Sequence, residues 1–310
     1  MVWKVFIDGR AGTTGLRISE RLAARQDIEL LSLPEELRKD AAARQDMMNQ
    51  ADCVFLCLPD DAAREAVTLV TNGTTAVIDT STAHRTLEGW VYGFPEISGL
   101  REQIRRSKRI ANPGCHATGF ISLIAPLTEN GLLPADAQLS CFSLTGYSGG
   151  GKKMIAEYEA DGRDPLLDAP RVYGLSQSHK HLPEMQKLCG LSCPPVFCPT
   201  VAPYYAGMEV LVPLHAGQIR CGTAELMDCY SNYYRDGLVR AEDDDENGFL
   251  SAGKMTGRDD LIISVRGNQD RLLLTARFDN LGKGASGAAI QNMNLLMGIP
   301  EDTGLRIGED

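Results

Sequence analysis

At 310 residues the chain is long enough for about two ordinary domains, and 43% hydrophobic with 23% charged residues is the composition of a folded globular protein. A formal net charge of −10 argues against nucleic acid as a partner, and the lack of any run of about 18 apolar residues argues against a membrane span. Nine scattered cysteines do not form the even set of a disulfide scaffold, and the start of the chain lacks a signal-peptide pattern, so we expect a protein of the reducing cytoplasm.

The first 112 residues alternate short apolar runs with helical patterns. Apolar runs at residues 2–7, 28–33, 53–58 and 76–78 predict buried parallel strands, and residues 14–24 have helical spacing. Pro59 ends the third run, and Asp60 or Asp61 is expected to cap the helix that follows. The alternation predicts an α/β fold with a Rossmann-like, doubly wound sheet.

Beyond about residue 138 the strand-like runs are separated by turns. They cover residues 138–145, 196–201, 209–214, 261–265 and 272–278, which predicts an α+β domain with a mainly antiparallel sheet. An apolar helix at about residues 285–297 has no evident place in that domain and is expected to pack on the first. We therefore predict one domain of residues 1–112 plus 285–310 and a second of residues 113–284.

Three glycines follow the first predicted strand, in the order Gly9-Arg-Ala-Gly12-Thr-Thr-Gly15. Glycine permits positive φ angles and lets backbone amides approach a pyrophosphate, which the N-terminus of a helix then favours. The position between a strand and a helix predicts a dinucleotide site in the first domain, with an ordinary glycine turn as the alternative.

The end of the second strand bears on the choice of dinucleotide. NAD sites usually have an acidic residue there, about 20 residues after the glycines, to bind the ribose hydroxyls. Ser32 occupies that place, with Arg38 and Lys39 nearby to hold a 2′-phosphate, so the pattern favours NADP. Glu35 and Glu36 count against this preference.

The helix-breaking segment Asn112-Pro-Gly stands directly before Cys115, and apolar residues at helical spacing come after it. Pro126 is expected to kink or shorten that helix. A cysteine at a helix N-terminus is stabilised as the thiolate and becomes nucleophilic. The other cysteines are expected to be inert, and Cys189, Cys193 and Cys198 lack the paired spacing of a zinc site, so we predict no metal.

Several motifs in one order resemble the N-acetyl-γ-glutamyl-phosphate reductase family, a relative of the aspartate-semialdehyde dehydrogenases. Besides Asn112-Pro-Gly-Cys115 they are residues 9–15, 77–81 (VIDTS), 92–96 (YGFPE), 146–153 (GYSGGGKK), 179–184 (HKHLPE) and 279–284 (DNLGKG). The short chain, and His116 where the family's longer form usually has tyrosine, resemble the short subclass (type 2).

The resemblance implies NADPH-dependent reduction of N-acetyl-L-glutamyl 5-phosphate to N-acetyl-L-glutamate 5-semialdehyde, through a thioester on Cys115, in arginine biosynthesis. It implies cofactor binding by the first domain, catalysis and oligomerisation by the second, and a homodimer or homotetramer. A histidine can move protons at neutral pH, and His181 matches the family's acid/base, with Glu184 placed to orient it.

The remaining site residues are also implied by the resemblance. The substrate is an anion, so an acidic protein must concentrate cations at its site. The implied substrate contacts are His179, Arg85, Asn112, Lys152 and Lys153. The implied cofactor contacts are Gly9, Gly12, Thr13, Thr14, Gly15, Ser32, Arg38, Ser81 and Asn280.

Two alternatives stay open at this point. The first is a related semialdehyde dehydrogenase of the aspartate or aminoadipate type, which would share the chemistry and differ in the acyl chain. The second is a non-catalytic, NADP-sensing protein, against which the combination of Cys115 and His181 argues.

Overall fold

The computed structural model describes residues 2–243 and 245–308 and divides the chain into two compact units. The first comprises the chain up to Pro113 together with Ala285–Leu305, and the second comprises Gly114–Gly284 and the chain from Arg306 onward. The first predicted domain also included residues 1, 309 and 310, which lie outside the described residues. No helix in the described part is long and apolar enough to cross a bilayer.

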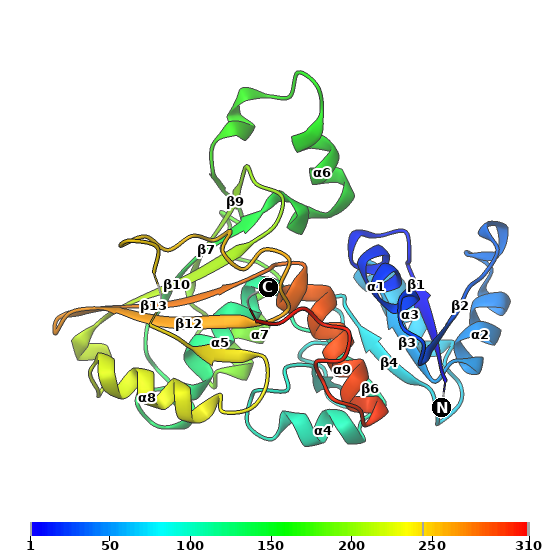
Figure 1. Cartoon of the computed structure of the whole chain (residues 1–310), viewed down its shortest axis with the longest axis horizontal. Helices are drawn as coiled ribbons and strands as arrows, with labels where there is room; N and C mark the ends of the chain where they lie inside the picture. Colours follow the sequence, from blue (N-terminus) through cyan, green and yellow to red (C-terminus); the bar gives the residue numbers. More distant parts are fainter. Residues whose placement is uncertain (1, 244, 309–310) are drawn as a thin grey trace. The chain divides into compact units, whose positions relative to one another are not determined.

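The first unit is built on a parallel sheet with the strand order β2-β1-β3-β4-β6-β5. Its strands are β1 (Trp3–Asp8), β2 (Ile28–Leu31), β3 (Cys53–Leu56), β4 (Ala76–Asp79), β5 (Val91–Tyr92) and β6 (Arg109–Ala111). Its helices are α1 (Thr13–Ala23), α2 (Ala41–Gln50), α3 (Asp60–Thr68), α4 (Leu100–Arg106) and α9 (Gly287–Met297), all labelled in Figure 1, together with the short η1 (Glu35–Leu37).

Helices cover both faces of this sheet, because successive strand residues point to opposite sides. Val5 and Ile7 of β1 share one apolar core with residues of α1, α4 and α9. Phe6, between them, belongs to another core with residues of α2 and α3. The doubly wound α/β fold predicted from the sequence is therefore confirmed.

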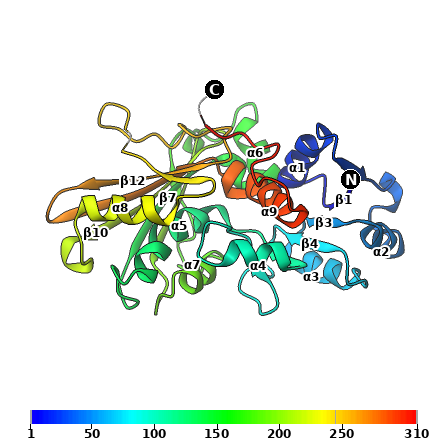
Figure 2. The same cartoon turned by 60° about the horizontal axis from the view of Figure 1, so that its bottom comes forward.

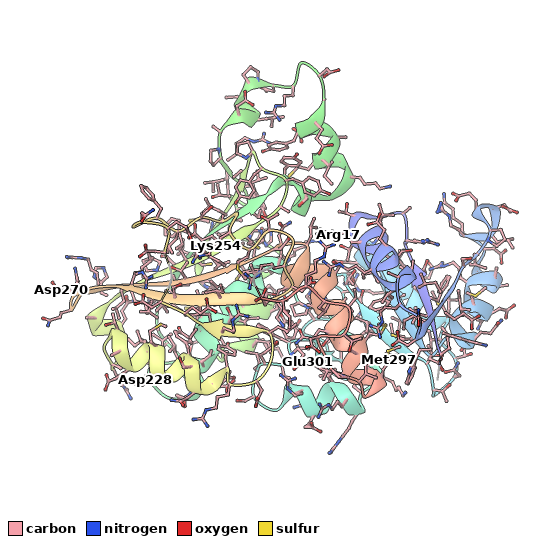
Figure 3. The ribbon with its side chains drawn as sticks, viewed as in Figure 1. Arg17, Asp228, Lys254, Asp270, Met297 and Glu301 are labelled. Carbon is pink, nitrogen blue, oxygen red and sulfur yellow. The ribbon has the colours of Figure 1, made fainter. Side chains whose placement is uncertain are left out.

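The second unit contains a mixed sheet with the strand order β11-β12-β13-β10-β7-β9-β8. Its strands are β7 (Ser140–Gly146), β8 (Arg171–Val172), β9 (Val196–Ala202), β10 (Met208–His215), β11 (Val239–Ala241), β12 (Leu261–Gly267) and β13 (Arg271–Phe278). Pairing is antiparallel except between β11 and β12 and between β7 and β9, as predicted for a mainly antiparallel sheet. Asp270, labelled in Figure 3, lies in the tight turn that joins β12 to β13.

Helices α5 and α8 of the second unit pack on one face of this sheet (Figure 2). The helical segments of the unit are α5 (Cys115–Glu129), α6 (Gly151–Glu159), α7 (Leu182–Leu188), α8 (Thr223–Tyr233) and the short turns η2 (Tyr147–Gly150), η3 (Pro165–Asp168) and η4 (Ala216–Gln218). The short η5 (Gly282–Ser286) begins in this unit and ends in the first. A Cβ atom at Gly119 of α5 would lie 2.4 Å from Val210 Cγ2, so only glycine lets the helix approach β10 this closely. This packing fixes the helix that begins with Cys115.

Pro126 was expected to kink or shorten its helix, and it does not shorten it, since α5 continues to Glu129. Proline has no N–H, so it cannot bond the carbonyl of Ser122, four residues earlier. The hydroxyl of Tyr234, directly after α8, donates to that carbonyl at 2.8 Å. A contact from a distant part of the chain thus replaces the missing hydrogen bond.

The predicted cap of α3 is wrong. Pro59 is the residue that precedes the helix, and no side chain caps it. The carboxylate of Asp60 instead accepts a hydrogen bond from the backbone N–H of Thr82 at 3.0 Å, and Asp61 pairs with Arg64 at 2.9 Å. The second strand is also shorter than predicted, ending at Leu31.

Candidate active site

Cys115 is the first residue of α5 and is half-buried. Gly114, before it, has an extended backbone, and its N–H donates to Glu184 Oε2 at 3.1 Å. The free N–H groups of a helix's first turn place positive partial charge beside the cysteine sulfur. Gly284 leaves room there, since a Cβ atom at that position would lie 3.0 Å from Cys115 Cβ.

Other cysteines differ from Cys115 in their surroundings. Burial raises the pKa of Cys53 to about 12, and burial also raises the pKa of Cys141. Thiols of this kind stay protonated and unreactive at neutral pH. Within residues 2–243 and 245–308, no group of three or more His, Cys, Asp or Glu side chains could hold a metal ion.

Three imidazoles gather near the start of α5. The ring centroids of His179 and His181 lie 4.8 Å apart, and those of His116 and His181 lie 5.5 Å apart. Phe197 of β9 packs edge-on against His116 and His179, at 5.3 and 5.2 Å. The cluster thus contains both histidines that the sequence singled out.

Glu184 links this cluster to the segment that carries Cys115. It is 1% exposed, and its Oε1 atom lies 4.0 Å from Nε2 of His181, while Oε2 accepts the N–H of Gly114. A carboxylate at that distance attracts an imidazolium without a direct hydrogen bond. The structure therefore brings His179, His181 and Glu184 together around the start of α5; their catalytic roles stay predictions.

Three residues of this site were missed as functional candidates. The sequence marks His116 only through the resemblance to the short subclass, and none of the family motifs contains Ser143 or Tyr173. Nδ1 of His116 lies 2.7 Å from Ser143 Oγ, and Nε2 lies 2.6 Å from the Tyr173 hydroxyl. A serine at a core-facing position of an apolar strand, and a tyrosine six residues before His179, were the available signals.

The predicted substrate cations are divided between the units. In the first unit, Arg85 Nε donates to the carbonyl of Asn112 at 2.9 Å. The side chain of Asn112 is itself buried and donates to the carbonyl of Ala285 at 3.1 Å. In the second unit, Lys152 and Lys153 are exposed near the start of α6. Their contacts with substrate stay predictions.

The glycine turn has the form that a dinucleotide site requires. Gly9 has a φ of 84°, and a Cβ atom there would lie 2.2 Å from the carbonyl oxygen of Cys57. A Cβ atom at Gly15 would lie 2.6 Å from the carbonyl oxygen of Gly9, so the turn itself needs both glycines. A Cβ atom at Gly12 would meet nothing closer than 3.4 Å, which leaves its surroundings open for a ligand.

Thr13 and Thr14 are the first residues of α1. The Thr13 hydroxyl oxygen is buried and has no hydrogen-bond partner within the part of the chain that the structure describes. Buried hydroxyls rarely lack a partner, so this atom fits a site that a bound group completes. The residues present at the turn therefore fit a pyrophosphate held at the N-terminus of α1.

The residues predicted to choose between NADP and NAD lie near η1. Ser32 is exposed and directly follows β2. Arg38 is paired with Glu35, one of the two acidic residues that counted against an NADP site. A 2′-phosphate would have to compete with that carboxylate, and the roles of Ser32 and Arg38 stay predictions.

The last two predicted cofactor contacts already have partners. Ser81 Oγ donates to the buried carboxylate of Asp79 at 2.7 Å, in the first unit. Asn280 belongs to the second unit, where its Oδ1 accepts the N–H of Gly207 at 2.9 Å and its Nδ2 donates to Ser148 Oγ at 3.0 Å. These bonds give both residues a clear structural function, and their cofactor contacts stay predictions.

Two protein-family models match the sequence. Residues 30–107 match the NAD-binding domain of semialdehyde dehydrogenases, and residues 115–280 match the dimerisation domain of the same enzymes. Among solved structures, aspartate semialdehyde dehydrogenase II from Vibrio cholerae has a TM-score of 0.73 at 16% identity, over 96% of this chain and 99% of that one. This likeness supports the fold.

Full-length relatives are much more similar. An N-acetyl-gamma-glutamyl-phosphate reductase from Chelativorans sp. is 46% identical over 96% of this chain and 99% of its own length. Proteins named N-acetyl-gamma-glutamyl-phosphate reductase 2 from Nostoc sp. and Pseudomonas putida are 43% and 44% identical, over 97% and 95% of this chain and 99% and 96% of their own. The chain therefore belongs to the N-acetyl-γ-glutamyl-phosphate reductase family, as its motifs predicted.

Proposed function

We propose that the protein is a cytoplasmic, NADPH-dependent enzyme that reduces N-acetyl-L-glutamyl 5-phosphate to N-acetyl-L-glutamate 5-semialdehyde, in arginine biosynthesis. The names of its full-length relatives support the substrate. The observation that carries the chemistry is a half-buried cysteine at the start of α5, adjoining a cluster of imidazoles. A protein that only senses NADP does not need a nucleophilic cysteine beside imidazoles, so this arrangement favours an enzyme.

Acylation is the first half of the proposed reaction. The sulfur of Cys115 forms a bond to the acyl carbon, the bond from that carbon to the phosphate oxygen breaks, and inorganic phosphate leaves. His181 takes the thiol proton, and Glu184 favours the imidazolium that results. Arg85, Lys152, Lys153 and His179 are the proposed partners of the phosphate and carboxylate groups.

Reduction of the thioester is the second half. When bound, NADPH supplies the hydride, and Gly9, Gly12, Thr13 and Thr14 are the proposed contacts of its pyrophosphate. His181 gives a proton to the oxygen of the thiohemiacetal and removes it again as the carbon–sulfur bond breaks. The aldehyde leaves, and the thiolate of Cys115 is restored.

Substrate assays in the reverse direction test this proposal. With NADP and phosphate, N-acetyl-glutamate semialdehyde should give a kcat/KM at least about 10²-fold above those of aspartate and aminoadipate semialdehydes, because a site that hydrogen-bonds the polar groups of its substrate discriminates strongly against analogues that lack them. A preference for aspartate semialdehyde would overturn the substrate. Tight NADPH binding without turnover of any of the three would favour the sensor.

A homodimer or homotetramer assembled through the open face of the mixed sheet is the proposed state in solution. Val210 faces α5, so Phe142 and Leu211, which pair across β7 and β10, point to the opposite face. Phe142 is 45% exposed, and Val196 of β9, on the same face, is 58% exposed. The matching dimerisation domain supports a second copy of the chain as the group that covers them.

Replacing Phe142 with glutamate should lower the mass measured by light scattering to that of a smaller oligomer or monomer, because it adds a charge to an apolar contact. Leu87→Glu is the matched control, since Leu87 is 53% exposed in the first unit. An unchanged mass for Phe142→Glu would exclude this face as the interface.

A further inference from the structure

His116 lies in the first turn of α5 and is 2% exposed. Its two ring nitrogens contact two hydroxyls, Ser143 Oγ at Nδ1 and Tyr173 OH at Nε2. It is the residue after Cys115, so its hydrogen bonds bear directly on the surroundings of that sulfur.

The charge of His116 follows from its surroundings. Burial lowers the pKa of His116 to about 3, with the nearby His179 adding to the effect. The ring is therefore neutral at neutral pH, with one nitrogen that donates a hydrogen bond and one that accepts. This makes it unfit to be the acid/base of the reaction, and it leaves two possible arrangements of protons.

Ser143 decides between these arrangements. It is fully buried on β7, and within the described residues its hydroxyl has no hydrogen-bond partner besides His116. If Nδ1 donated to Ser143, the hydroxyl proton would be buried with no acceptor, at a cost of roughly 1–3 kcal/mol. Ser143 therefore donates to Nδ1, and the proton of His116 is on Nε2.

The consequence falls on Tyr173. Nε2–H of His116 donates to the phenol oxygen, so the phenol proton is directed to another acceptor. Burial raises the pKa of Tyr173, and the charge of a Cys115 thiolate raises it further, so the phenol stays protonated. The phenol is also one hydrogen bond away from His116, the residue that follows Cys115 in the first turn of α5.

We propose that Ser143 and His116 are positioning residues that hold the Tyr173 hydroxyl as a hydrogen-bond donor to the carbonyl oxygen of the acyl group on Cys115. The phenol stabilises the negative charge that this oxygen develops when the sulfur or the hydride adds to the carbon. No proton is transferred through His116, and His181 remains the acid/base. The inference rests on the proposed function of Cys115.

Steady-state kinetics of Tyr173→Phe test the donor. Because the charge on oxygen exists only in the transition states, kcat should fall about 10²-fold with KM within about 3-fold of wild type. Tyr233→Phe is the matched control: Tyr233 ends α8, its hydroxyl donates to Glu129 at the far end of α5 at 2.8 Å, and kcat of this variant should not change. A kcat for Tyr173→Phe within about 2-fold of wild type would overturn the donor role.

Paired variants of His116 test the positioning role. Gln can still donate to Tyr173 and Leu cannot, so kcat of His116→Gln should exceed that of His116→Leu by about 10-fold. Ser143→Ala removes the hydroxyl that keeps the proton of His116 on Nε2, and should lower kcat on the order of 5-fold. Thermal unfolding and iodoacetamide labelling of Cys115 show that each variant is folded. Equal kcat values for His116→Gln and His116→Leu would refute the positioning role.

Failure of the Tyr173 inference can be distinguished from failure of the proposed function. If Tyr173→Phe keeps full activity while Cys115→Ser has none, only the present inference fails. If Cys115→Ser keeps its activity, the proposed function fails first. The two His116 variants decide the question if Tyr173→Phe does not fold.

Discussion

Replacing Cys115 with serine is expected to lower kcat by at least about 10³-fold, because the proposed reaction requires a covalent bond that a serine hydroxyl forms far more slowly. A hydroxyl at a helix N-terminus is not ionised at neutral pH, and an oxygen ester is a poorer hydride acceptor than a thioester. The substitution is nearly isosteric at a half-buried position, so the fold should be retained. Initial rates of NADPH oxidation measure the loss.

Two controls separate lost chemistry from lost structure. The Kd for NADPH should stay within about 3-fold of the wild-type value, because the proposed pyrophosphate contacts lie at the glycine turn of the first unit. Cys229→Ser removes another half-buried thiol, on α8, and should keep full activity. Retention of more than about a tenth of wild-type kcat by Cys115→Ser would contradict the covalent mechanism.

Replacing His181 with glutamine should lower kcat by about 10²–10⁴-fold, the usual contribution of a general acid/base. Glutamine keeps a polar side chain next to Glu184 but cannot exchange a proton with the thiol or the thiohemiacetal. The part of the pH dependence of kcat/KM that arises from proton exchange by the His181 imidazole should disappear. His215→Gln, at the exposed end of β10, is the control and should behave like wild type.

The result for His181 also distinguishes it from its neighbours in the cluster. His179 is proposed to contact substrate, so its loss should raise KM more than it lowers kcat. If kcat/KM of His181→Gln depends on pH as in the wild type, and its kcat is near the wild-type value, another group is the acid/base.

Much of the fold was predictable because local patterns agree with the tertiary structure. Continuous apolar runs such as 53–58 became central parallel strands, and the glycine turn is followed by α1 as expected. Where the prediction was wrong, a distant contact decided the outcome. Asp60 binds Thr82 instead of capping its helix, and Tyr234 compensates the proline within α5.

The same reason limits what the sequence says about the active site. Cys115 could be singled out, because the breaker and the helix that define it are adjacent in the chain. The roles of Ser143 and Tyr173 depend on an imidazole 27 and 57 residues away, which no local spacing encodes. Motif resemblance found Asn280 but could not reveal that its amide is bonded to Gly207 and Ser148.

Trapping the acyl-enzyme tests the central claim most directly. Incubating the protein with N-acetyl-L-glutamyl 5-phosphate in the absence of NADPH, quenching in acid and mapping peptides by mass spectrometry should locate an N-acetylglutamyl group on Cys115, removable by hydroxylamine and missing in Cys115→Ser. An acyl group on a different residue, or turnover with no acyl-enzyme at any time, would contradict the account.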